Sequence, residues 1–428
     1  MRHLIQPTPP AALCPEVLSV LQLCVINEPL FPNLKTLLLW RLNVESVPFI
    51  PLFLSPRTTV VSFGKFASGI PKAMIASMIT TLQTQCPNLQ EIFLSLSRDP
   101  MVVAAVSGMV LTNNQNTLQR FHVDCPLTEE AHEIICKLPN LHDLSMVIGS
   151  DTPLPSLVLP SLTTLNVTYD DGSDWLQGFR GATLGKLASV EITTDSNSIG
   201  GFLEVFESVA LTTSVSATLS TFMFHTSQRW RPNYRSLLPF TQLRELAIDF
   251  SCDQGCSSTI DDDTIIDMAR TMPKLKLLHL GGTPCRTPTG VTAKGLAALS
   301  HYCPHLFDLR VHFQADSLDP RPASIITSDD NPIIPRVDCA LKRLQVGEIP
   351  VTEESALMVA LTLLRIFPRL DFIVYSDEGW EEVAETIALS KQLVDASSKK
   401  FSLIPSRSNV NDTSHRSHIP GCCLIERS

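Results

Sequence analysis

The stretch Cys86–Leu94 reads Cys-Pro-Asn-Leu-Gln-Glu-Ile-Phe-Leu, and its pattern decides the fold. A leucine follows the proline two residues later, and apolar residues stand three and five positions after that leucine. The same phrase returns at Phe31–Leu39, Leu138–Met146, Leu159–Val167, Met272–Leu280, Cys303–Val311 and Phe367–Tyr375. A phrase that returns at intervals indicates a repeat protein rather than a set of globular domains.

Weaker copies without the proline fill most of the gaps between these phrases. The leucine position of the copies falls at residues 34, 58, 89, 118, 141, 162, 187, 219, 243, 275, 306, 341 and 370, with a threonine at 58. These thirteen copies leave twelve intervals of 21 to 35 residues, with a mean of 28. That mean lies in the range of about 20–29 residues typical of leucine-rich repeats. A globular α/β protein with coincidental phrases is the alternative, and the near-regular spacing disfavours it.

Each copy predicts one short strand, because its last two apolar residues are two positions apart. The connecting segments partly predict helices. Thr128, Asp261–Asp263 and Thr352 mark the N-terminal ends of three of them, and two more fall within Gly69–Cys86 and Thr289–Tyr302. The proline of the phrase then ends the helix. We therefore expect an α/β leucine-rich-repeat solenoid, or horseshoe, with a parallel β-sheet on the concave face and helices or irregular segments on the convex face.

The chain divides into three parts on this interpretation. Residues 1–30 are expected to form an N-terminal capping segment, because the end repeats of a solenoid need a cap. Residues 31–390 form the solenoid of about thirteen irregular repeats. Residues 391–428 hold six Lys/Arg against three Asp/Glu and are rich in Ser and Asn, which predicts a disordered basic tail.

Composition narrows the partners and the compartment. The net charge of −10 disfavours nucleic acid as the main partner. No apolar run reaches the roughly 18 residues expected of a membrane helix, and the N-terminus lacks the apolar core of a signal peptide. The cysteines are scattered, and Cys86 and Cys303 stand just before a phrase proline, where small core side chains are expected. These features predict a cytoplasmic or nuclear protein with reduced thiols.

We find no sequence motif that carries catalysis or holds a cofactor. Phosphate-binding, dinucleotide-binding and nucleophile-elbow patterns are absent from the sequence, so we expect no enzyme and no cofactor. His132 and Cys136 have helical spacing suited to a metal, but we expect Cys136 in the core, His132 at the surface and no metal. Cys252 and Cys256 form a loop pair without further ligands. The pair Cys422–Cys423 lies at the wrong distance from the end for prenylation.

The concave face is the expected binding surface, because residues between the buried strand positions face solvent there. The candidate partner-binding residues are Asp143, Asn166, Glu191, His225, Glu245, Asp249, His279, Asp308, Arg310 and His312. Simple solvation is the alternative for any one of them. As a set, they favour a protein partner that offers a basic or polar segment.

The Cys-Pro-x-Leu phrase resembles the cysteine-containing repeats of F-box proteins. The opening Pro15–Leu21, followed by Leu30–Leu37, is similar to the repeat region of the fungal F-box/leucine-rich-repeat family, and the resemblance covers about residues 10–390. It implies a scaffold whose repeats recruit a substrate for ubiquitin ligation. An F-box that docks onto a Skp1-type adaptor is not found before the first repeat, so we expect adaptor binding only with an F-box supplied upstream. The alternative is a stand-alone leucine-rich-repeat regulator, for example of a small GTPase or a phosphatase.

Overall fold

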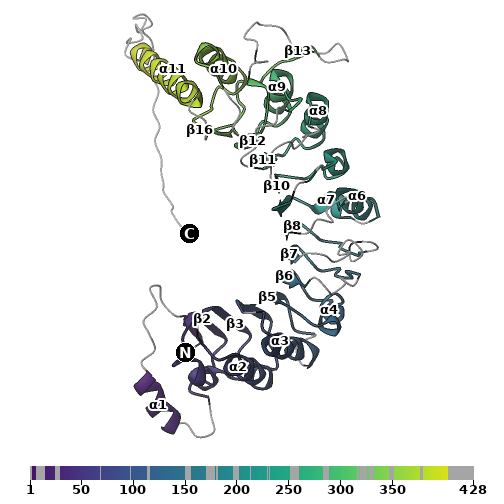
Figure 1. Ribbon diagram of the computed structural model, residues 1–428, viewed down its shortest axis with the longest axis vertical. Coiled ribbons are helices and arrows are strands. Elements are labelled where there is room, and N and C mark those ends of the chain that lie inside the picture. The colour runs from purple at the N-terminus through teal and green to yellow at the C-terminus, as the bar shows by residue number, and fades with distance from the viewer. Residues whose placement is uncertain are drawn as a thin grey trace, which may run out of the picture.

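The protein, seen in a computed structural model, is a horseshoe with a sheet along its inner, concave side and helices along its outer, convex side (Figure 1). The predicted α/β leucine-rich-repeat solenoid is therefore confirmed. The structure describes residues 2–5, 15–24, 29–67, 69–96, 98–112, 116–149, 156–169, 179, 182–195, 202–212, 214–228, 230, 232–250, 260–282, 289–315, 318, 325–326, 332–346, 351–375 and 379–402.

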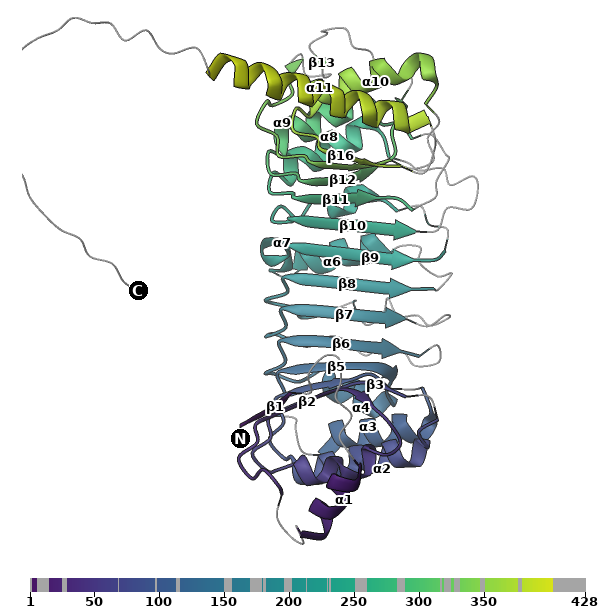
Figure 2. The ribbon, with the colours of Figure 1, turned by 90° about the vertical axis from the view of Figure 1, so that its left-hand side faces the viewer.

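The sheet contains fourteen strands of the described residues, parallel and in chain order (Figure 2). They are β1 (His3–Ile5), β2 (Thr36–Leu42), β3 (Val60–Phe66), β4 (Glu91–Leu94), β5 (Arg120–Pro126), β6 (Asp143–Ile148), β7 (Thr164–Tyr169), β8 (Ser189–Thr194), β9 (Thr221–Thr226), β10 (Glu245–Phe250), β11 (Leu277–Leu280), β12 (Asp308–Val311), β15 (Arg343–Gln345) and β16 (Phe372–Val374). A separate antiparallel pair consists of β13 (Ile325–Ile326) and β14 (Pro332–Ile333).

The strands share one register. Every strand from β2 to β16 in the large sheet begins two residues after the leucine position of its repeat. Equivalent residues therefore lie side by side: Leu246 of β10 pairs with Leu278 of β11, which pairs with Leu309 of β12. All three side chains are fully buried. In the strands of four or more residues, the second and fourth residues thus point into the core, and the first and third point to the concave side.

Helices fill most of the described connections. They are α1 (Pro15–Cys24), η1 (Val47–Phe53), α2 (Lys72–Gln85), α3 (Pro100–Thr112), α4 (Glu129–Ile135), α6 (Phe202–Thr212), α7 (Val215–Thr218), η2 (Tyr234–Leu237), α8 (Asp262–Thr271), α9 (Ala293–Tyr302), α10 (Glu353–Ile366) and α11 (Gly379–Ser402), with η marking 3₁₀ helices. The five helices predicted in the connections between repeats are confirmed as α2, α4, α8, α9 and α10. Sequence reasoning missed α3 and α6.

The phrase proline ends its helix by acting on the residue before it. The C-cap residues Cys86, Met272, Cys303 and Phe367 each precede the proline and share φ between −114° and −128° and ψ between 59° and 78°. These angles lie outside the α-helical region, which a following proline disfavours. Each C-cap N–H still donates to the carbonyl four residues back, so the helix closes its last turn before the chain enters the strand.

The core is one continuous layer between the sheet and the helices. The residue at the leucine position is buried in every repeat, including Thr58. In the middle of the solenoid, Phe202 stacks against Phe206, Phe222 and Phe224. The thiols with described positions are free and buried, at Cys86, Cys125, Cys136, Cys303 and Cys339. Burial raises the pKa of the Cys86 thiol to about 11, which fits a role as core filling.

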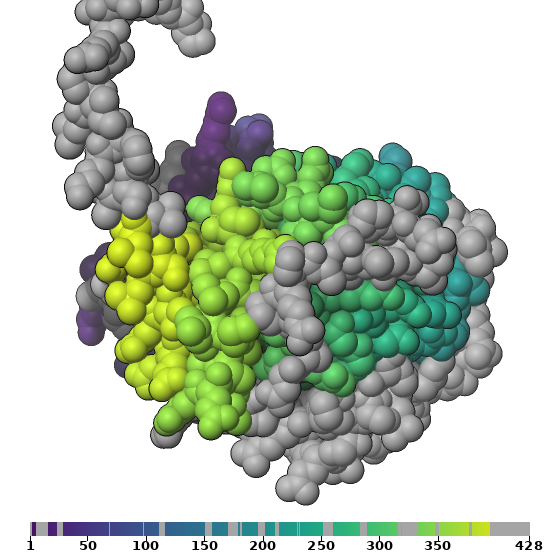
Figure 3. Space-filling model, turned by 90° about the horizontal axis from the view of Figure 1, so that it is seen from above, coloured from purple at the N-terminus to yellow at the C-terminus, as the bar shows by residue number. Residues whose placement is uncertain are grey.

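The C-terminal end differs from the expected division, while the N-terminal segment has a strand beside its helix. The N-terminal segment contributes a strand, since β1 pairs with β2, in addition to helix α1. At the other end, α11 continues to Ser402, beyond the expected start of the tail at residue 391, and lies beside α10 (Figure 3). Residues 403–428, with Cys422 and Cys423, lie outside the described residues, as do Cys252 and Cys256. None of the described helices is long and apolar enough to cross a membrane.

Candidate functional site

The concave face of the sheet is open, because the described convex helices lie behind it (Figures 1 and 2). The side chains at the first and third strand positions are mostly half-buried, and they alternate with fully buried ones. The ten predicted residues belong to β6–β12 or, for His312, to the residue after β12. The face thus gathers nine of them, all except His312, on seven neighbouring strands.

Cross-strand pairs organise the N-terminal part of this face. Arg120 of β5 lies 3.5 Å from Glu91 of β4, and His122 Nε2 lies 3.1 Å from Asp143 Oδ2 of β6. The His122 ring also packs on Phe93, with ring centroids 4.6 Å apart. Of these residues, only Asp143 was predicted. Glu91, Phe93, Arg120 and His122 stand at the first and third positions of their strands, so the alternation of buried and exposed residues could have identified them.

An exposed aromatic side chain stands beyond these pairs. Trp40 at the fifth position of β2 is 47% exposed. On the neighbouring strand the equivalent residue is Gly64, where an added Cβ would overlap the Trp40 carbonyl oxygen. The backbones of β2 and β3 therefore approach closely here, and glycine permits this approach. The N-terminal part of the face thus holds aromatic side chains and Arg120, which are residue types enriched in protein interfaces.

Polar hydrogen bonds continue the pattern in the middle of the face. Asn166 of β7 donates from Nδ2 to Glu191 Oε2 of β8 at 3.0 Å. Thr221 of β9 donates to Glu245 Oε2 of β10 at 3.3 Å. Each of the two predicted carboxylates is therefore held by a neighbouring strand. Such contacts reduce the side-chain freedom that a partner would otherwise have to remove on binding.

A tighter cluster lies towards the C-terminal end. His279 of β11 contacts Asp308 of β12 at 3.0 Å, and Gln345 and Arg343 of β15 approach the same carboxylate at 3.4 Å and 3.7 Å. A histidine on one strand that faces an aspartate on the next thus occurs at β5–β6, β9–β10 and β11–β12. The recurrence makes this pairing a feature of the face rather than of one repeat.

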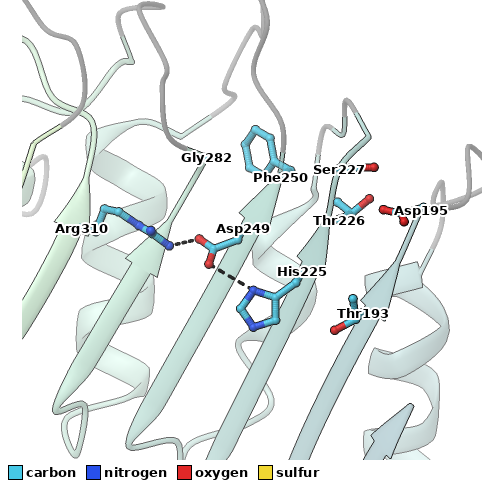
Figure 4. A pocket seen from close by; sticks show the side chains of 9 residues that line it. All are labelled: Thr193, Asp195, His225, Thr226, Ser227, Asp249, Phe250, Gly282 and Arg310. Atoms are coloured by element: carbon cyan, nitrogen blue, oxygen red, sulfur yellow. Dashed lines mark ion pairs between the residues drawn. The ribbon is translucent and has the colours of Figure 1, made fainter. Parts of the chain in front are cut away.

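A hollow of about 340 Å³ lies at the carboxyl ends of β8, β9 and β10 (Figure 4). The lining residues are Thr193, Asp195, His225, Thr226, Ser227, Asp249, Phe250, Gly282 and Arg310. Asp249 Oδ2 lies 3.2 Å from His225 Nδ1, and Asp249 Oδ1 forms an ion pair with Arg310 Nη2. Burial lowers the pKa of His225 and that of Arg310 from their usual values. Three predicted residues therefore form one chain of contacts in the hollow.

His312 differs from the prediction. Its side chain is buried, at 3% exposure, rather than presented on the concave face. The strand ends at Val311, and the His312 ring lies 3.7 Å from the place that a Cβ of Gly281 would occupy. Since Gly281 lacks a side chain, the ring fills the space beside it. Burial lowers the pKa of His312 to about 4, so it is neutral at pH 7.

His132 also differs from the prediction, since it is buried with Cys136 instead of lying at the surface. Helix α4 is short and packs against α3, which encloses this face of it. Burial lowers the pKa of His132 to about 4. Within the described ranges, no group of three His, Cys, Asp or Glu side chains is arranged to hold a metal ion.

Comparisons with known proteins add little to this geometry. No family model matches the chain, and no curated protein matches it. The chain is similar to a solved structure described as the crystal structure of the Rad7 and Elc1 complex in yeast, with 15% identity, 79% of this chain and 84% of that chain covered, and a TM-score of 0.39. At this level the likeness carries no conclusion about function.

Proposed function

We propose that this protein is an interaction scaffold that holds a partner protein on its concave face. The observation that carries the proposal is the open sheet surface from β2 to β16, whose side chains are held in place by contacts between neighbouring strands. A surface with ordered side chains loses little conformational entropy when a partner binds. The concave curvature also lets many strands contact one partner at once.

The chemistry of the face suits a protein rather than a nucleic acid. Carboxylates outnumber guanidinium groups at the strand positions that face the concave side, as at Glu91, Asp143, Glu191 and Asp308. A phosphate backbone would be repelled by such a surface. Aromatic groups at Trp40 and Phe93 offer the kind of anchor that dominates binding energy in protein interfaces.

We further propose the substrate-recognition role of an F-box-type ubiquitin ligase receptor in the cytosol or nucleus. The support is that the Cys-Pro-x-Leu phrase resembles the repeats of F-box proteins. The thiols of Cys86 and Cys303 in this phrase are buried and free. In this role a Skp1-type adaptor would bind an F-box supplied upstream of the repeats. A stand-alone regulator of a small GTPase or phosphatase is the second candidate, which the same open face would serve.

Binding of a defined partner tests the scaffold. A protein that co-purifies with the tagged chain is purified and titrated against Arg120→Ala, on the concave face, and against Lys137→Ala, an exposed residue next to helix α4. We expect weaker binding only for Arg120→Ala. Equal effects of the two variants, or a cross-linking map confined to the convex helices, would contradict the proposal.

Adaptor binding tests the ligase role separately. The chain extended by its upstream coding sequence is mixed with purified Skp1-type adaptor and analysed by size-exclusion chromatography with light scattering. A stable complex supports the receptor. Lack of a complex, together with a partner that binds the concave face and is not ubiquitinated, favours the stand-alone regulator.

A further inference from the structure

We propose that the hollow at the ends of β8, β9 and β10 binds the ammonium group of a lysine side chain from the partner. This inference rests on the proposed function, because it names the chemistry by which the concave face recognises its partner. It depends on three properties of the hollow: which charges are already compensated, which acceptors remain, and how large the space is.

The central carboxylate of the hollow is already compensated. Asp249 sits between His225 and Arg310, and each of its oxygens faces one of them (Figure 4). The Arg310 side chain is only 11% exposed, so its charge is used inside the protein and is poorly placed to attract an anion. A carboxylate only accepts hydrogen bonds, so the His225 Nδ1 that faces it carries the proton. The His225 Nε2 is then an acceptor.

The remaining polar groups are acceptors or hydroxyls. Asp195 is exposed just after β8, and it forms no ion pair with any residue that the structure describes. Thr193 and Ser227 place hydroxyl groups on the same side of the hollow as Asp195 and His225 (Figure 4). The charges of Asp249 and Arg310 cancel and His225 is neutral, so among the lining residues the uncompensated charge is that of Asp195. A compact cation with several N–H donors matches this set.

The size and walls of the hollow fit a side chain rather than a larger ligand. Its volume of about 340 Å³ lies near the lower end of ligand pockets, which span about 300–1,000 Å³. Phe250 and Gly282 form part of the wall. An aromatic wall can pack against the methylene stem of a lysine while the ammonium reaches the polar acceptors. Thr193, His225 and Asp249 stand at the fifth positions of their strands and so on the concave side, where the partner of the scaffold would lie.

Fluorescence anisotropy with labelled octalysine and octaglutamate tests the inference on the full chain. We expect octalysine to bind and octaglutamate not to bind at the same ionic strength. Asp195→Asn should weaken octalysine binding about fivefold, since one exposed ion pair contributes about that factor. The matched control is Glu354→Gln, an equal charge change in the exposed first turn of α10, and we expect it to leave the affinity unchanged.

Two results would overturn the inference. One is tighter binding of octaglutamate than of octalysine, and the other is an equal effect of Asp195→Asn and Glu354→Gln. Circular dichroism and the melting temperature of each variant establish that both are folded. If either result appears while the purified partner still maps to the concave face, the lysine site fails and the scaffold stands. If octalysine binding depends on Asp195 but the partner maps to the convex helices, the scaffold proposal fails instead.

Discussion

His279 on β11 donates a hydrogen bond from Nε2 to Asp308 Oδ1 on β12 at 3.0 Å, and the two side chains are only 15% and 12% exposed. The same carboxylate is approached by Gln345 and Arg343 from β15. One aspartate therefore joins three consecutive strands near the C-terminal end of the sheet. Since a solenoid is stabilised mainly by interfaces between neighbouring repeats, this residue stabilises two such interfaces at once.

Asp308→Asn should destabilise the protein, because it removes the charge that His279 and Arg343 face. We expect the free energy of unfolding to fall by about 1–3 kcal/mol, the range for a buried polar group that loses a charged partner. Urea denaturation measures the effect. The control is Asp338→Asn, whose exposed pair with Arg336 should contribute less than about 1 kcal/mol. Equal losses for the two variants would contradict this account.

Stability should depend on the protonation of the buried His132. Its pKa is lowered to about 4 in the folded protein, whereas an unfolded histidine titrates near 6.5. The unfolded chain therefore binds a proton in a pH range where the folded chain does not. The neutral His132 side chain therefore contributes fully to the free energy of unfolding above about pH 6.5. This contribution, of up to about 3 kcal/mol, is lost as the pH falls from about 6.5 to 4.

His132→Leu should flatten this pH dependence, and urea denaturation from pH 4 to 7.5 measures it. The slope should not vanish, because the pKa of the buried His312 is also about 4. His305→Gln, a histidine substitution at an exposed position, is the matched control. If the free energy of unfolding of His132→Leu depends on pH as strongly as that of the unaltered protein, His132 is not the source of the pH dependence.

A repeat leucine should be far more sensitive than an exposed one. Leu275 is fully buried behind the start of β11, so Leu275→Ala should cost about 2–5 kcal/mol through lost burial and a cavity. Leu357 on α10 is 54% exposed, and Leu357→Ala should change stability by less than about 0.5 kcal/mol. Guanidinium unfolding followed by circular dichroism compares the two. A similar loss at both positions would be inconsistent with the observed burial.

Two glycine substitutions should act in opposite directions. Gly64→Ala places a Cβ against the Trp40 carbonyl oxygen, so β2 and β3 must separate and stability should fall by about 1–3 kcal/mol. Gly108 lies inside helix α3, where an added Cβ meets nothing within 4 Å. Gly108→Ala should therefore stabilise the helix by about 0.5–1 kcal/mol. Thermal melting curves measure both effects. A higher melting temperature for Gly64→Ala would contradict the close approach of the β2 and β3 backbones.

Sequence reasoning located strands better than helices, for a physical reason. The leucine position predicts where each strand starts, because the apolar residues of the phrase, such as Leu275 and Leu278, are the residues that become buried. Helix α3 was missed because its residues Pro100–Thr112 are apolar almost all round and show no one-sided pattern. Strand β1 was missed because three residues give too short a signal to separate from a loop.

The candidate face was predicted in outline, while its pairings were not. The alternation of apolar and polar residues along each strand places Asp143, Glu191 and Asp308 on the same side of the sheet. This prediction does not require knowledge of the contacts between strands. Which residues meet across the strands depends on register and on side-chain reach. The sequence therefore could not reveal that His122 meets Asp143 or that Arg310 meets Asp249 across β11.

The amino-acid sequence by itself determined the repeat, the strand positions and the apolar side of each strand, because these follow from local spacing and from burial of the phrase. Only the tertiary structure decided which polar residues are neutralised, which remain open in the hollow and which are enclosed. His312 has the spacing of a concave-face residue, yet it is buried because Gly281 on the neighbouring repeat leaves room for its ring. Such outcomes depend on contacts between residues distant in sequence, and local spacing does not encode them.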